Sequence, residues 1–171
     1  MRVTFVRSAG RRDRVYVARD DGSEASWEFP SYGDAPPHDL VHFVVETGLG
    51  IRPGIFGRVA AGMDLARVNA LANRIGGKDK YRVMGDDLGD VYLSEAAAAA
   101  VAPWLDPSVD DATCLDGLRA GAAHYGVAVP AELDVAAMAR TRARLVEVAA
   151  RWRALGDRGA LAFRHPGGED A

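Results

Sequence analysis

The sequence has a single cysteine, Cys114, and no long apolar run. One thiol excludes an intrachain disulfide and a cysteine-rich zinc cluster, and it favours a reducing compartment. No stretch approaches the roughly 20 consecutive apolar residues that a membrane-spanning helix needs. The first residues alternate charged and apolar side chains from Arg2 onward, unlike a secretory signal. We therefore expect a cytoplasmic protein that is neither exported nor embedded in a membrane.

The chain also lacks an excess of positive charge. It has 21 Lys and Arg against 24 Asp and Glu, with a formal net charge of −3. Nucleic-acid binding depends on neutralising phosphates, so this balance gives no electrostatic reason to expect such a partner. No Gly-x-Ser-x-Gly nucleophile motif occurs, and the glycine-rich residues 48–54 and 76–78 do not match a phosphate-binding loop. The identity of any partner stays open, including a second copy of the chain.

The composition is that of one ordinary globular domain. Hydrophobic residues make up 49% and charged residues 26% of 171 residues, which suffices to bury a substantial core. We expect a single α+β domain over residues 1–171. Its predicted parts are a β-meander at 1–30, a mainly helical region at 37–155, a final strand within 159–165 and a frayed tail at 166–171.

Three short segments near the N-terminus have strand character. Residues 3–6, 14–17 and 24–29 are rich in β-branched and aromatic side chains. In the third, Ala25, Trp27 and Phe29 alternate with polar residues, which is typical of a sheet with one buried face. Turn residues separate the segments, so they predict a three-stranded antiparallel meander. Residues 160–164 could return to this sheet as a fourth strand.

The remaining apolar patterns predict helices that cover the sheet. Residues 130–155 give the clearest and longest one, with a continuous apolar side flanked by arginines. Spacing and glycine stops predict further helices at residues 37–47, 51–62, 63–75, 94–105 and 110–125. Residues 76–80 have the composition of a loop. The arginines between residues 7 and 14 are interpreted as a solubilising hairpin tip.

Two histidines and two carboxylates share one stripe of the helix predicted at residues 37–47. At about 100° per residue, His38, Asp39, His42 and Glu46 occupy an arc of roughly 100°, while apolar residues fill the rest. Histidines four residues apart lie about 6 Å apart along the axis, so both rings can reach one divalent ion, such as zinc. We therefore predict His38 and His42 as metal ligands.

The segment His38-Asp39-Leu40-Val41-His42 resembles the H-E-x-x-H helix of zinc metallopeptidases. The resemblance covers five residues and implies metal-assisted hydrolysis with two histidine ligands. In that family a glutamate is the general base, whereas Asp39 is one methylene shorter. On this hypothesis Asp39 or Glu46 positions the attacking water.

The third ligand must come from another segment, because Glu46 lies about 12 Å along the helix axis from His38. Glu46 could instead orient His42. The sequence does not rank the candidates for the third ligand, which are Asp34, Asp64, the Asp86-Asp87 pair, Glu95 and His124.

A second interpretation needs no metal. A helix with an apolar side must carry polar residues on the other, so the stripe could be a solvated face, or His42 could be a partly buried histidine satisfied by Glu46. The chain would then be a non-catalytic binding or interaction domain that uses this face. The two hypotheses differ in one feature, because a metal site needs a further ligand close to both imidazoles.

Overall fold

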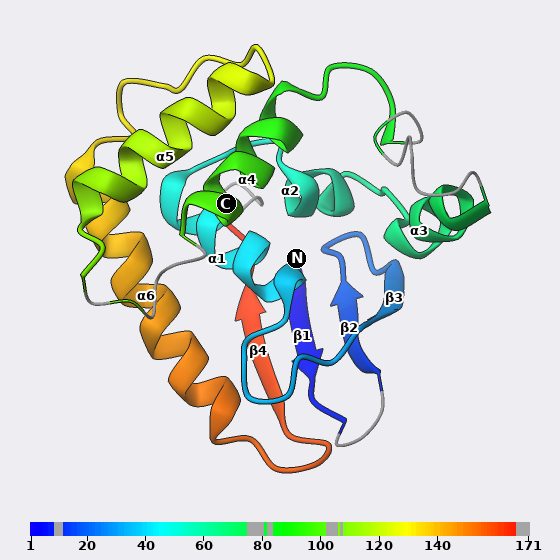
Figure 1. Cartoon of the computed structure of the whole chain (residues 1–171). Coiled ribbons are helices and arrows are strands. Elements are labelled where there is room, and N and C mark those ends of the chain that lie inside the picture. Colours follow the sequence, from blue (N-terminus) through cyan, green and yellow to red (C-terminus); the bar gives the residue numbers. More distant parts are fainter. Residues whose placement is uncertain (9–11, 75–80, 82–83, 102–105, 107, 167–171) are drawn as a thin grey trace.

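The computed structural model describes residues 1–8, 12–74, 81, 84–101, 106 and 108–166, with an antiparallel sheet and several helices (Figure 1). The sheet has the order β3-β2-β1-β4. Its strands are β1 (Arg2–Val6), β2 (Asp13–Ala18), β3 (Glu24–Phe29) and β4 (Ala160–Arg164). The predicted α+β fold is thus confirmed, with an N-terminal three-stranded meander and a fourth strand from the C-terminal part that pairs with β1.

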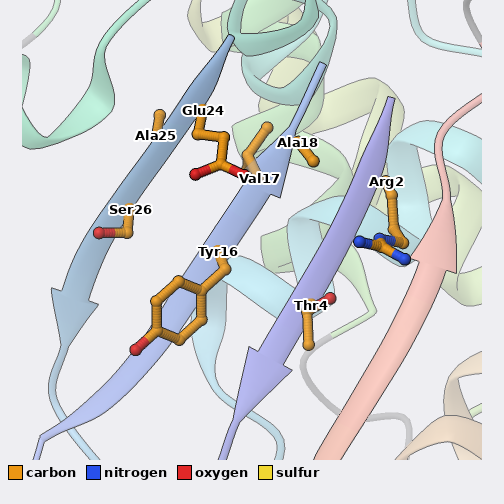
Figure 2. Close-up of a pocket in the computed structure, with 8 residues that line it drawn as sticks. All are labelled: Arg2, Thr4, Tyr16, Val17, Ala18, Glu24, Ala25 and Ser26. Carbon is orange, nitrogen blue, oxygen red and sulfur yellow. The ribbon is translucent and has the colours of Figure 1, made fainter. Parts of the chain in front are cut away.

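Side-chain alternation gives the sheet two different faces. The inner face is apolar and buried, and it consists of Val3, Phe5, Val15, Val17, Trp27, Phe29 and Leu161. Phe43 of the first helix packs edge-on against Phe5 at a ring-centroid distance of 6.0 Å. The opposite face has a hollow of about 360 Å³. Figure 2 shows the side chains that line it, among them the polar residues Arg2, Tyr16 and Glu24.

Six helices occupy the part of the chain that the structure describes between β3 and β4. They are α1 (His38–Leu49), α2 (Ile55–Ala60), α3 (Leu65–Arg74), α4 (Gly89–Ala100), α5 (Asp111–His124) and α6 (Val135–Arg153). Buried apolar side chains from the sheet and from these helices form one continuous core. Within the described residues, no helix combines the length and the apolar character needed to cross a membrane.

Three helices begin four or five residues from their predicted starts, and one of them is α2, which begins at Ile55 rather than at residue 51. The sequence predicted a helix from Ser94, but α4 begins at Gly89, after Leu88, which offers no capping side chain. Ser94 and Glu95 therefore lie inside the helix. The long helix α6 begins at Val135 rather than Pro130, because Asp134 caps it by accepting a hydrogen bond of 2.7 Å from the Ala137 amide.

The other predicted boundaries differ less from those in the structure, or they fall on residues that the structure does not describe. α1 extends to Leu49, two residues beyond its predicted end, and Gly50 terminates it in the left-handed conformation at φ 68°. Residues 76–80, 102–105 and 167–171 lie outside the described residues, so the predicted loop, the end of the alanine-rich helix and most of the tail are not described.

Arg7 has a structural role that the sequence did not indicate. Its Nη1 donates to the carbonyl oxygens of Trp152, Arg153 and Leu155 at 3.1–3.2 Å, and Nη2 donates to Asp34 at 2.6 Å. These carbonyls lie at the C-terminal end of α6 and just beyond it, where helical acceptors have no partner within the helix and where a cation is favourable. The interpretation of Arg7 as a solubilising tip residue is therefore wrong, because this side chain joins the meander to the C-terminal helix.

His165 is a buried titratable group just beyond β4. Its backbone N–H donates to the Met1 carbonyl at 2.9 Å, and its side chain is 4% exposed beside the Phe43 ring. Burial lowers the pKa of His165 below its ordinary value of 6.5, and the positive charges of Arg52 and the N-terminus lower it further. The native protein therefore favours neutral His165.

We expect the free energy of unfolding to fall as the pH drops below about 6.5, because the unfolded chain then binds a proton that native His165 resists. This site contributes a slope of at most about 1.4 kcal/mol per pH unit, down to the lowered pKa of the folded state. His165→Phe keeps a buried ring and should remove this component. Urea denaturation of both proteins between pH 7 and pH 5 measures it, and parallel losses of stability would contradict the assignment.

Candidate metal centre

Three potential ligands from two helices lie together in the structure. They are His38 and His42 of α1 and Glu95 of α4, and their ligand atoms all lie within 4.8 Å of one another. The two imidazole rings have a centroid distance of 4.5 Å, and Nε2 of His42 lies 3.6 Å from Oε2 of Glu95. One carboxylate from another segment thus joins both predicted histidines.

The other candidates for the third ligand have different surroundings. Asp34 pairs with Arg7, and Asp64 accepts a hydrogen bond from the Arg67 amide near the start of α3. The carbonyl oxygens of Asp86 and Asp87 accept hydrogen bonds from Arg58. His124 contacts the Tyr125 ring at the end of α5. Among the described residues, only Glu95 joins the two histidines in a potential metal-binding group.

The cluster extends from the core to the surface. His42 is 2% exposed and the Glu95 side chain 14%, whereas His38 is exposed. Among the described residues, Nε2 of His42 has no hydrogen-bond partner. Buried ring nitrogens normally have a partner, because desolvation without one is unfavourable. The Nε2 atom of His42 is therefore the clearest indication that the cluster binds a further group, such as a metal ion.

The other nitrogen of His42 begins a buried chain of hydrogen bonds. Nδ1 lies 2.8 Å from Oγ of Ser94, and this hydroxyl donates to Oε1 of Glu46 at 2.7 Å. Oε1 and Oε2 of Glu46 also accept hydrogen bonds of 2.8 Å from the amides of Ile55 and Phe56. Burial raises the pKa of Glu46, while the Ser94 hydrogen bond, His42 and the two amides act in the opposite direction.

Gly54 leaves room for this carboxylate. A Cβ atom at residue 54 would lie 2.5 Å from Cδ of Glu46 and 2.8 Å from each carboxylate oxygen. The backbone of Gly54 is extended, with φ −65°, so space rather than backbone conformation requires a glycine here. The Ile55 and Phe56 amides directly follow Gly54, so its small size lets Glu46 reach both of them.

Asp39 lies at the mouth of the centre. Its Oδ2 accepts a hydrogen bond of 2.7 Å from Nε1 of Trp27, which fixes the carboxylate against the edge strand β3. Asp39, His38, His42 and Glu95 help to line an inner cavity of about 70 Å³. His38 and Asp39 also line an outer groove of about 690 Å³, together with residues such as Trp27, Tyr32 and Arg14.

The structure separates the two carboxylates that the sequence assigned to catalysis. Asp39 lines both hollows, whereas Glu46 is 1% exposed and uses both oxygens in hydrogen bonds to Ser94, Ile55 and Phe56. The interpretation of the whole stripe as a solvated face is wrong for His42 and Glu46, because both are buried. Nor does Glu46 satisfy His42 directly, since Ser94 lies between them.

Two residues at this centre were not anticipated from the sequence. Ser94 was interpreted as the start of a helix, and no pattern within its own segment indicates contact with His42. The Tyr81 phenol hydrogen-bonds to Glu95; burial, followed by the negative charge of Glu95, raises the pKa of Tyr81. Tyr81 also packs on the Tyr92 ring at a centroid distance of 5.2 Å. Both contacts depend on how helix α4 is placed.

No family model, curated protein or solved structure matches this chain.

Proposed function

We propose that the protein binds one divalent metal ion, zinc or a similar first-row ion, through His38, His42 and Glu95, and that it uses the ion in hydrolysis. The observation that carries the proposal is the buried Nε2 of His42, which has no hydrogen-bond partner among the described residues and lies 3.6 Å from Glu95. Two imidazoles and a carboxylate are a donor set that suits such ions.

The distances support this assignment. In a tetrahedral site with bonds of about 2.0–2.1 Å, ligand atoms lie roughly 3.4 Å apart. The His42–Glu95 separation of 3.6 Å is already close to this value, and the largest separation in the cluster is at most 4.8 Å. Because His38 is exposed, rotation of its side chain can close the remaining gap without disturbing the core.

The surroundings suit hydrolysis more than a purely structural ion. Three protein ligands leave a coordination position open, and a bound ion would supply Lewis acidity and lower the pKa of water. Asp39 would take a proton from a water that attacks the carbonyl carbon of an ester or amide, and would return it to the leaving alcohol or amine as the C–O or C–N bond breaks, so no further reactant is needed. Trp27 holds Asp39 in place, and the outer groove gives a substrate access to both Asp39 and His38.

Zinc binding by the full chain tests the proposal. We expect metal-stripped protein to bind about one equivalent of zinc in calorimetry, and the double variant His38→Ala/His42→Ala to lose roughly 100-fold or more in affinity. Glu95→Gln should also weaken binding. With zinc loaded, Asp39→Asn should retain the ion but lose roughly 100-fold in hydrolysis of an activated aryl ester.

The matched control is His124→Ala, which removes an exposed histidine of α5 and should leave zinc affinity unchanged. Circular dichroism checks that each variant is folded. Equal zinc affinity in the wild type and the folded double variant would overturn the metal site. Zinc binding with equal ester hydrolysis by the wild type and Asp39→Asn would overturn the catalytic role of Asp39. That result would favour the alternative hypothesis, in which the protein is a non-catalytic binding domain.

A further inference from the structure

We infer that Glu46, acting through Ser94, holds His42 in the tautomer with the proton on Nδ1, so that Nε2 presents its lone pair to the metal site. Ser94 and Glu46 are then positioning residues that touch neither metal nor substrate. The role in metal binding rests on the proposed function above, whereas the tautomer itself is a property of the metal-free protein.

The donor and acceptor roles in these hydrogen bonds place the proton of His42 on Nδ1. The backbone amides of Ile55 and Phe56 donate to the two oxygens of Glu46 and favour its ionised form, and an ionised carboxylate can only accept. Ser94 has one hydroxyl proton and donates it to Oε1 of Glu46 at 2.7 Å. Towards Nδ1 of His42, at 2.8 Å, the hydroxyl oxygen can therefore only accept. Nδ1 must carry a proton, and a neutral imidazole then has its lone pair on Nε2.

Burial strengthens the hydrogen bonds that join His42, Ser94 and Glu46. Ser94 is 0% exposed, Glu46 1% and His42 2%, so bulk water does not compete for these hydrogen bonds. The opposite tautomer would place two lone pairs, those of Nδ1 and the Ser94 oxygen, against each other at a buried contact. It would also place a proton on Nε2, where a ligand needs a lone pair.

The position of Ser94 links this effect to the assembly of the site. His42 and Glu46 are one turn apart on α1, and α4 inserts the Ser94 hydroxyl between their polar atoms. The next residue of α4 is Glu95, the third potential ligand. One turn of α4 thus orients the His42 ring and supplies the carboxylate beside it, so both features depend on the same packing of α4 on α1.

The tautomer can be measured without metal. In uniformly ¹⁵N-labelled, metal-stripped full chain at about pH 8, above the ordinary histidine pKa, long-range proton–nitrogen spectra distinguish a protonated ring nitrogen from one with a lone pair. We expect protonated Nδ1 and unprotonated Nε2 for His42. In Ser94→Ala, which removes the acceptor without adding volume, we expect the proton to shift towards Nε2 and zinc affinity to fall roughly 10–100-fold.

Thr141→Ala is the matched control for general destabilisation. It also removes a buried hydroxyl, one that donates to the Ala137 carbonyl on α6, and should change neither the His42 tautomer nor zinc affinity. A proton on Nε2 in the wild type, or an unchanged tautomer in Ser94→Ala, would overturn the inference. The expected tautomer shift without zinc binding in the wild type would support the orienting role and overturn the proposed function instead.

Discussion

We expect Gly54→Ala to lower the free energy of unfolding by about 3 kcal/mol, because the new methyl group displaces a buried carboxylate. The Cβ atom would lie 2.5 Å from Cδ of Glu46, a separation that requires one of the two groups to move. Glu46 could move only by giving up the amides of Ile55 and Phe56, and hydrogen bonds to a charged group each contribute about 1.5–3 kcal/mol. Urea denaturation at neutral pH measures the loss.

Gly57→Ala is a control three residues along the same chain. Its Cβ would meet only Cβ of Pro53, at an ordinary contact distance of 3.4 Å. Because glycine is unfavourable inside a helix, this substitution should stabilise the protein by about 0.5 kcal/mol. If both variants changed stability by the same amount, steric displacement of Glu46 would not be the cause.

We expect Gly48→Ala to lower the free energy of unfolding by about 2 kcal/mol through a clash where α1 crosses α6. Its Cβ would lie 2.6 Å from Oγ1 and 3.0 Å from Cγ2 of Thr141. Thr141 is 1% exposed and its hydroxyl donates to the Ala137 carbonyl. A β-branched side chain in a helix has few alternative rotamers, so the helices must separate, and such overpacking typically costs about 1–3 kcal/mol.

Thr141→Ala should rescue most of this loss, since it removes the two closest atoms. We expect the double variant to be more stable than Gly48→Ala alone, although Thr141→Ala by itself costs about 1 kcal/mol for its buried hydrogen bond. A double-mutant cycle in urea measures the coupling between the two positions. Strictly additive effects would show that the α1–α6 contact does not limit the size of residue 48.

Much of the fold followed from local patterns. The alternation at residues 24–29 placed Trp27 and Phe29 on one face, and both are buried. The strand at 160–164 was also predicted, because its composition and flanking glycines are local features. The start of α4 was missed, because Leu88 and Gly89 carry none of the capping side chains that mark a helix N-terminus in a sequence.

For the candidate site as well, local patterns predicted some features, and others depended on how the helices pack. The i,i+4 spacing of His38 and His42 follows from helix periodicity, and their rings contact each other in the structure. Choosing Glu95 among the candidates for the third ligand required knowing which helix lies beside α1. The role of Glu46 was left open between water positioning and orientation of His42, and its burial with three hydrogen bonds favours orientation.

The sequence by itself determined the α+β class, the apolar face of the meander and the pairing of two histidines on one helical stripe. These features depend on backbone geometry within single segments, which repeats every 2 residues in strands and about every 3.6 in helices. Only the tertiary structure decided that His42 and Glu46 are buried and that α4 supplies Ser94 and Glu95. Ser94 is 52 residues from His42 and 48 from Glu46 along the chain, so their contacts arise from helix packing.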